Sequence, residues 1–251
     1  KYYHHKDHPH DHHSHAGHCA AEISVKQSGT REIKVVRRVL DVNEKMADEN
    51  RKLFADNGVF VLNVMSSPGS GKTTTLEKTL ARIVPDYKSA VIVGDICTTH
   101  DADRLAVSGA PVVQINTDEF GGDCHLAAHV IEKAAGGLNL ADIDLLIVEN
   151  IGNLVCPAEF DIGEDSRVVV LSVTEGEDKP AKYPLMFREC EVALLNKIDL
   201  LPHLDYDANM AVDYIHQVHP DMPVFQISAR TEEGFEPWIE WLKGRIKDKL
   251  G

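Results

Sequence analysis

The 251-residue sequence contains no run of apolar residues that approaches the roughly 20 needed for a helix to cross a membrane. Its first twenty residues are polar and rich in histidine, so they lack the apolar core of a signal peptide. Basic residues are few, 26 against 40 acidic ones, and the net charge of −14 argues against a general nucleic-acid-binding surface. We therefore expect a cytoplasmic protein that binds neither membranes nor nucleic acid.

Cysteine is also sparse, with five widely scattered positions: Cys19, Cys97, Cys124, Cys156 and Cys190. An odd number at such spacing does not form a disulfide framework. We expect a reducing compartment and thiols that are free, buried or bound to metal.

Hydrophobic patterning predicts a tail followed by one domain. Residues 1–30 lack apolar periodicity and cannot bury enough surface to offset chain entropy, which predicts a disordered tail. Residues 31–57 show helical spacing that ends at Asn57-Gly58. From there to residue 251, short runs of Val, Ile and Leu alternate with amphipathic segments. The predicted strands are 59–65, 89–94, 111–115, 144–149, 167–173, 192–196 and 224–228, and the predicted helices are 73–83, 101–109, 124–136, 179–189, 205–219 and 234–250. This alternation predicts a three-layer α/β domain with a mostly parallel sheet.

A glycine-rich segment, SSPGSGKT at 66–73, follows the first predicted strand. It matches the P-loop pattern G-x-x-x-x-G-K-S/T except at Ser66, which replaces the first glycine. In such a loop the backbone N–H groups point at phosphate, the lysine reaches the β- and γ-phosphates, and the threonine hydroxyl binds Mg²⁺. The predicted nucleotide-binding residues of this segment are Gly69, Ser70, Gly71, Lys72, Thr73 and Thr74. The domain at 31–251 is therefore predicted to be a P-loop NTPase.

The base is predicted from Asn196-Lys197-Ile198-Asp199, an N-K-x-D pattern that follows a predicted strand. A carboxylate at Asp199 can accept two N–H bonds from guanine, a pair that adenine does not offer. The stem of Lys197 can lie along the base plane. Ser228-Ala229 follows the last predicted strand, where such proteins place a backbone donor for the guanine oxygen. We expect GTP as the substrate.

Two acids, Asp95 and Glu149, end predicted strands and should face the nucleotide crevice. With Lys72 they form the predicted catalytic set, and Asp95 together with Thr73 is predicted to hold Mg²⁺. Gly152 would let the backbone approach the γ-phosphate. By contrast, we expect Asp101 and Asp103 to be solvated residues at a helix start.

A candidate metal site combines Cys124, His125 and Cys156. Thiolate and imidazole suit Ni²⁺ or Zn²⁺ rather than Mg²⁺. The alternative is that both cysteines are buried small hydrophobes, which is their commonest role.

Eight of the fourteen histidines lie in the predicted tail. They are His4, His5, His8, His10, His12, His13, His15 and His18. Clustered imidazoles in a flexible tract bind nickel and similar ions loosely, and we favour this interpretation over an appended tag or a simple polar tract.

The sequence resembles the nickel-inserting GTPases that mature NiFe-hydrogenase, the HypB type. The resemblance covers about 31–250, and its most specific segments are VENIGNLVCP at 148–157 and SVTEGEDKPAKYP at 172–184. It implies a SIMIBI-type P-loop fold and a homodimer that forms with GTP. It further implies that Cys124, His125 and Cys156 bind nickel or zinc at the dimer interface and that Lys182 contacts the nucleotide across the dimer. The implied partners are a HypA-type nickel chaperone and the large subunit of the hydrogenase.

Two features depart from that family's pattern. The CxxCGC motif that begins many members is not in this sequence, where Cys19 stands alone among histidines. Ala127 occupies a position where an acidic residue is expected.

Together these patterns predict a GTPase with slow intrinsic turnover that delivers nickel to a hydrogenase precursor. Three alternatives remain: a urease-maturation GTPase, a small-molecule kinase that uses ATP, and a nickel storage protein with a vestigial GTPase fold. The order Cys156-Pro157-Ala158 differs from the Cys-Pro-His motif of the first, and N-K-x-D argues against the second.

Overall fold

The computed structural model describes residues 31–95, 100–116 and 125–251. The predicted tail with its eight histidines lies outside these ranges, as do Cys97 and Cys124. The chain divides into two units, Lys1–Arg37 and Arg38–Gly251, and the second carries the sheet and the site described below.

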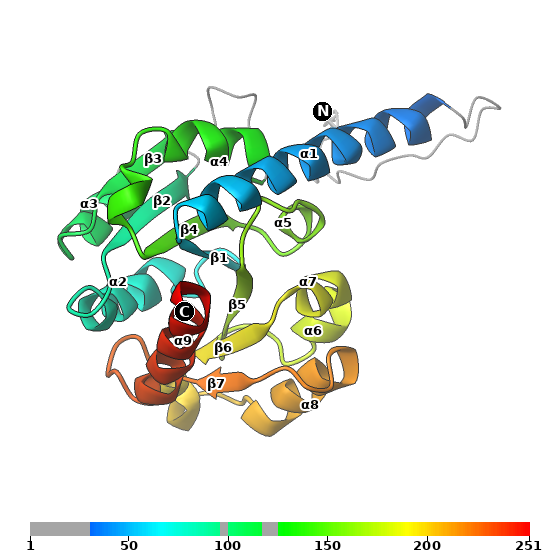
Figure 1. The fold of residues 1–251 in the computed structure, drawn as a ribbon. Coiled ribbons are helices and arrows are strands. Elements are labelled where there is room, and N and C mark those ends of the chain that lie inside the picture. The colour runs from blue at the N-terminus through cyan, green and yellow to red at the C-terminus, as the bar shows by residue number, and fades with distance from the viewer. Residues whose placement is uncertain (1–30, 96–99, 117–124) are drawn as a thin grey trace, which may run out of the picture. The chain divides into compact units, whose positions relative to one another are not determined.

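A seven-stranded sheet forms the centre of the second unit, and all seven predicted strands are confirmed (Figure 1). The strands are β1 (Phe60–Ser66), β2 (Ser89–Asp95), β3 (Val112–Asn116), β4 (Leu145–Gly152), β5 (Ser166–Ser172), β6 (Val192–Asn196) and β7 (Val224–Gln226). Their order is β3-β2-β4-β1-β5-β6-β7, and all six pairings are parallel. Because β1 lies between β4 and β5, the loop after β1 opens into the crevice at the carboxyl ends of the strands.

Helices cover both faces of this sheet. Their bounds are α1 (Arg31–Asp56), α2 (Lys72–Ile83), α3 (His100–Ala106), α4 (Ala128–Ala135), α5 (Cys156–Glu159), α6 (Lys179–Lys182), α7 (Pro184–Glu189), α8 (Ala208–Val218) and α9 (Phe235–Leu250), with 3-10 helices η2 (Leu140–Asp142) and η3 (Ile198–His203). Figure 1 shows α2 and α9 side by side on one face. The predicted three-layer α/β fold is confirmed.

Alternate residues of β1 show why its sequence is mostly apolar, with Asn63 and Ser66 as its polar members. Phe60, Leu62 and Val64 join a buried cluster with α2, α3 and α9. Val61 packs on the opposite face with α1 and α4, and Met65 packs on that face with α7 and α8. A strand that is covered on both faces needs hydrophobic residues on both of them, so its apolar positions do not simply alternate with polar ones.

Several helix boundaries differ from the predicted ones. The helix predicted at 124–136 begins at Ala128, because Ala127 has an extended backbone (φ −90°, ψ 157°). The helix predicted at 179–189 is two short helices, because Pro184 has no N–H to continue α6 and instead starts α7. The helix predicted at 205–219 begins later, where the side chain of Asp207 caps α8 by accepting from Asn209 N and Met210 N.

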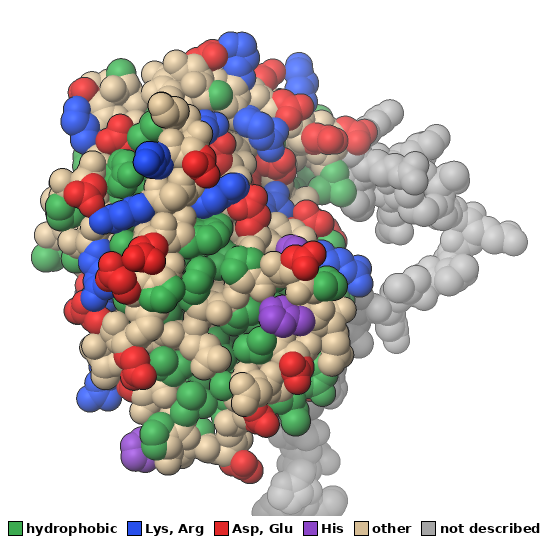
Figure 2. Space-filling model, turned by 60° about the horizontal axis from the view of Figure 1, so that its bottom comes forward, with side chains coloured by type: hydrophobic (Ala, Val, Ile, Leu, Met, Phe, Trp, Pro, Cys, Tyr) green, Lys and Arg blue, Asp and Glu red, His purple; other side chains and the backbone are tan. Residues whose placement is uncertain are grey.

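The surface of the described residues fits the acidic composition. On the face shown in Figure 2, Lys and Arg side chains are interspersed with Asp and Glu rather than gathered in one area. Within the described ranges, no helix combines the length and the apolar character needed to cross a bilayer.

Candidate nucleotide-binding site

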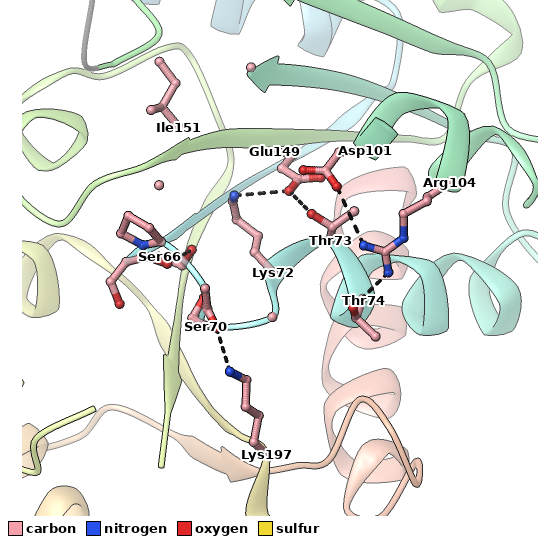
Figure 3. Close-up of a pocket in the computed structure, with 16 residues that line it drawn as sticks. Ser66, Ser70, Lys72, Thr73, Thr74, Asp101, Arg104, Glu149, Ile151 and Lys197 are labelled. Carbon is pink, nitrogen blue, oxygen red and sulfur yellow. Dashed lines mark hydrogen bonds and ion pairs between the residues drawn. The ribbon is translucent and has the colours of Figure 1, made fainter. Parts of the chain in front are cut away.

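A cavity of about 520 Å³ opens at the carboxyl ends of β1 and β4 (Figure 3). The loop from β1 to α2 supplies nine consecutive lining residues, Ser66 to Thr74. Glu149, Ile151 and Gly152 line it from β4, and Lys197 closes the far end. The predicted phosphate loop therefore lies in a cavity at the crevice that the strand order creates.

Backbone geometry explains the glycines of this loop. Gly69 and Gly71 have φ angles of 76° and 94°, in the left-handed region that other residues rarely adopt. A Cβ at Gly71 would also lie 2.5 Å from Asn196 Nδ2. Glycine is therefore required at position 71 both for the turn and for the close approach of the guanine-pattern asparagine.

Lys72 and Glu149 form a buried ion pair at the cavity floor. Lys72 Nζ lies 3.1 Å from Glu149 Oε1, and the two side chains are only 12% and 2% exposed. Thr73 Oγ1 donates to the same carboxylate oxygen at 2.7 Å. Among the described residues, buried Glu149 Oε2 has no hydrogen-bond partner.

These contacts fit a divalent cation. A buried carboxylate oxygen without a partner beside a threonine hydroxyl is the hard oxygen chemistry that Mg²⁺ prefers. Asp95, the other predicted magnesium ligand, ends β2 at the same edge of the sheet, and its side chain lies outside the described part of the structure.

The predicted guanine-recognition residues come together through hydrogen bonds. Ser228 Oγ donates to Asp199 Oδ1 at 2.6 Å, and Ala229 N donates to Asn196 Oδ1 at 3.0 Å. Asn196 Nδ2 donates to the carbonyl of Ser70 at 3.0 Å, and Lys197 Nζ donates to that of Gly69 at 2.6 Å. The loops after β6 and β7 are thus tied to each other and to the phosphate loop.

Two of the predicted metal ligands are described. His125 stacks on Phe160, with ring centroids 3.6 Å apart and planes 23° from parallel. Phe160 directly follows the one-turn helix α5, which begins at Cys156. The structure therefore brings His125 to the element that carries Cys156, whose thiol is half-buried. Among the residues that the structure describes, no three His, Cys, Asp or Glu side chains converge as a ready-made metal site.

Similarity to known proteins identifies the family. Residues 60–226 match the family model described as the CobW/HypB/UreG nucleotide-binding domain. Hydrogenase maturation factor HypB of Azotobacter chroococcum mcd 1 is 49% identical over 216 residues, which cover 86% of this chain and 70% of that protein. Hydrogenase maturation factor HypB of Escherichia coli strain K12 is 47% identical over 230 residues, which cover 91% of this chain and 78% of that protein. This chain belongs to the HypB family of hydrogenase maturation factors.

Solved structures agree with that assignment. The crystal structure of HypB from Helicobacter pylori in complex with nickel gives a TM-score of 0.77 at 37% identity and covers 83% of this chain and 96% of that one. The signal recognition particle receptor FtsY from Elizabethkingia anophelis shares the fold alone, with a TM-score of 0.52 at 17% identity. The predicted family and the predicted SIMIBI-type fold are confirmed, and the cavity belongs to a nucleotide-binding domain.

The lysine predicted to contact nucleotide across a dimer of this HypB-family chain does not line the cavity. Lys182, on α6, is 61% exposed and pairs with Asp178 at 2.7 Å. The hydrogen bond to Asp178 raises the pKa of Lys182. Its predicted contact with the nucleotide of a second protomer stays a prediction.

Two charged residues of the cavity were not predicted from the sequence. Asp101 lies in the first turn of α3, as expected, but it lines the cavity rather than facing only solvent. Arg104, one turn later on α3, also lines the cavity and donates to Thr74 Oγ1 at 2.9 Å. The sequence did offer a signal for them: an acid and an arginine three residues apart on the helix that follows β2. Asp103 is exposed, as predicted.

Proposed function

We propose that this chain is a GTPase that binds nickel and delivers it to a NiFe-hydrogenase precursor in the cytoplasm. GTP-dependent homodimerisation is coupled to metal binding at the dimer interface. The observation that carries the proposal is the hydrogen-bond network that fixes Asp199 and ties its loop to the phosphate loop. Ser228 holds its carboxylate and Asn196 ties the same loops to Ser70, which is the arrangement that selects guanine over adenine.

Hydrolysis at this site depends on positioning and charge rather than on a covalent intermediate. Thr73, Glu149 and Asp95 would hold Mg²⁺, which neutralises charge on the phosphates. Lys72 is already at the cavity and exchanges Glu149 for phosphate oxygens when nucleotide binds. The backbone N–H groups from Gly69 to Thr74 hold the phosphates, and Gly152 lets β4 approach the loop closely: a Cβ there would lie 3.2 Å from Pro68 Cα. A single protomer hydrolyses GTP slowly. Hydrolysis is faster in the dimer, where the second protomer contributes its Lys182 from α6.

Nickel is the cargo, bound by Cys124, His125 and Cys156, with zinc as the competing ion. The neighbouring positions of His125 and α5 support this, as does the relative from Helicobacter pylori, which was solved in complex with nickel. The histidines between His4 and His18 add a loose store. The expected partners are a HypA-type chaperone, which supplies nickel, and the hydrogenase large subunit, which receives it.

The first experiment measures binding of GDP, a non-hydrolysable GTP analogue and ADP to a variant that lacks residues 1–20. Tight binding of both guanine nucleotides with Mg²⁺, and at least about 100-fold weaker binding of ADP, is expected because two hydrogen bonds to a charged group are lost. Equal affinity for ADP would contradict a GTPase and favour a kinase.

The second experiment titrates Ni²⁺ and Zn²⁺ into the same protein in each nucleotide state, while its mass in solution is followed. Stoichiometric binding that changes with nucleotide, together with a dimer in one state, is the expected result. Cys156→Ser should weaken it at least tenfold. Cys190→Ala is the matched control, because complete burial raises the pKa of the Cys190 thiol and keeps it protonated. Equal nickel affinity in the GDP and GTP states would refute the coupling.

A further inference from the structure

Arg104 brings a cation to the cavity from an element outside the phosphate loop. It lies on α3, and its side chain extends toward the first turn of α2 (Figure 3). Its side chain is 43% exposed and lines the same cavity as Lys72 and Lys197. These three are the lysines and arginines that line the cavity within the described part of the chain.

The other two cations already have defined tasks. Lys72 is held by Glu149 at the floor, 3.1 Å away, and Lys197 donates to the Gly69 carbonyl at the base-binding end. A nucleoside triphosphate carries about four negative charges, more than one lysine and one Mg²⁺ neutralise. Arg104 is the remaining cation on the wall of the cavity.

The orientation of the guanidinium is fixed by α2. Arg104 Nε donates to Glu77 Oε1 at 3.3 Å, and Nη2 donates to Glu77 Oε2 at 2.5 Å. This two-point contact holds one edge of the planar group, and Nη2 also reaches Thr74 Oγ1. Glu77 therefore acts as an anchor that pins the arginine to the helix whose first turn bears Thr73 and Thr74.

The Nη1 edge of the Arg104 guanidinium still has N–H donors that can bind a ligand. Nη1 lies 3.7 Å from Asp101 Oδ1, which is an ion pair but exceeds hydrogen-bond distance. Arginine has five N–H donors in a rigid fork that matches phosphate oxygens. A phosphate that approaches the first turn of α2 can accept from Nη1 without displacing Glu77.

We propose that Arg104 is a nucleotide-binding residue whose Nη1 edge donates to the phosphate chain, with Glu77 as its positioning residue. The proposal rests on the proposed function, because it requires a guanine nucleotide in this cavity. It adds a phosphate contact from α3, so that nucleotide binding draws together the helices that follow β1 and β2.

The test compares Arg104→Gln with wild type for binding of GDP, a non-hydrolysable GTP analogue and IDP, with Mg²⁺. The affinity for each nucleotide should fall at least about tenfold, because a charge-assisted hydrogen bond is lost. The preference for GDP over IDP should stay unchanged, because the guanine-recognition residues lie on the loops after β6 and β7. Arg104→Lys, which keeps the charge but not the fork, should lose less, and Glu77→Gln should lose less than Arg104→Gln.

Arg245→Gln is the matched control, since this arginine on α9 pairs with Glu191 at 3.0 Å and does not line the cavity. It should bind as wild type does. Wild-type affinity in a folded Arg104→Gln variant would overturn the inference, and so would a loss confined to the GDP-over-IDP preference. If Arg104→Gln does not fold, the two other variants decide. Wild-type nucleotide affinity in both Arg104→Lys and Glu77→Gln would then overturn the inference. Failure of wild type to bind guanine nucleotides is a separate result, and it would reject the proposed function instead.

Discussion

One hydroxyl orients the carboxylate of Asp199, the residue predicted to recognise guanine. Oδ1 accepts from Ser228 Oγ at 2.6 Å, and the same hydroxyl accepts from Thr231 N at 3.1 Å. The carboxylate is thus held at the start of η3, at the mouth of the loop after β6. In the proposed function, its second oxygen and its charge are left to accept from a base with two adjacent N–H donors.

Asp199→Asn should change the base that this protein prefers. An amide in place of the carboxylate presents one acceptor and one donor, which matches xanthine, with a carbonyl where guanine has its amino group. We expect the affinity for GDP to fall at least about 100-fold, because two hydrogen bonds to a charged group are lost. The variant should then bind XDP more tightly than GDP. Competition with a fluorescent nucleotide measures both. The idea fails if the variant keeps the wild-type preference for GDP.

At the scale of an element, the loop from β7 to α9 is anchored to α2. Glu232 accepts from Lys78 Nζ at 2.9 Å and from Arg82 Nη2 at 2.8 Å. Its φ of 65° is unusual for a residue other than glycine, and these two cations help to hold it there. Because Ser228 and Ala229 belong to the same loop, this anchor fixes the predicted guanine-recognition loop to the helix that begins at the phosphate loop.

The anchor should depend on pH in a defined direction. Hydrogen bonds from Lys78 and then Arg82 lower the pKa of Glu232 below its ordinary value. A lowered folded-state pKa means that the stabilisation is present above the unfolded-state pKa and is lost as the pH falls through the folded one. Glu232→Gln should therefore lower Tm at pH 7 by about 2 °C, the equivalent of ~1 kcal/mol for two partly exposed pairs, and this difference should close below about pH 4.

Glu236→Gln provides the comparison for that prediction. Glu236 is 72% exposed, and Arg82, at 3.2 Å, is its one ion-pair partner in the described part of the chain. Its replacement should change Tm by less than Glu232→Gln does. Scanning calorimetry at several pH values measures both, and a Glu232→Gln deficit that persists undiminished in acid would show that charge is not its cause.

At the scale of the whole domain, the segment 160–165 joins α1 to the sheet. Asn50 Nδ2 donates to the carbonyls of Ala128 and Ile162, so α1 holds both the start of α4 and this segment. Glu164 accepts a hydrogen bond from Asn63 Nδ2 of β1 at 3.0 Å. Burial raises the pKa of the Glu164 carboxyl, although the nearby Arg167 acts to lower it. One segment therefore connects Phe160, which stacks on His125, with a buried asparagine of β1.

Gly163 is the tightest point of that junction. Its φ is 88°, and a Cβ would lie 2.6 Å from the carbonyl oxygen of Ala47 and 2.8 Å from Arg51 N, both on α1. Gly163→Ala should lower the free energy of unfolding by about 2–4 kcal/mol, since overpacking adds to the backbone cost. Gly58→Ala is the control: φ is 67° and nothing lies within 4 Å, so only the backbone cost of about 1 kcal/mol applies. Equal losses in urea unfolding would mean that the contact with α1 contributes nothing.

Much of the fold followed from local sequence. The seven strands were predicted because each is a short apolar run, and the phosphate loop because its glycines meet a backbone requirement within a few residues. The predicted helix at 179–189 missed a break that Pro184 dictates. Start positions such as Ala128 were missed because tertiary contacts set them: Asn43 Oδ1 accepts from Ala128 N across 85 residues.

The sequence by itself therefore determined the parallel α/β architecture, the phosphate loop, the guanine pattern and the family. Each depends on residues close together in the chain, where periodicity and motif spacing carry the information. Only the tertiary structure decided that Arg104 meets Thr74, that Ser228 orients Asp199, and that His125 stacks on Phe160. Those contacts join residues about 30 apart in the chain. Their geometry depends on how the helices pack and on the order of the strands, which no local pattern specifies.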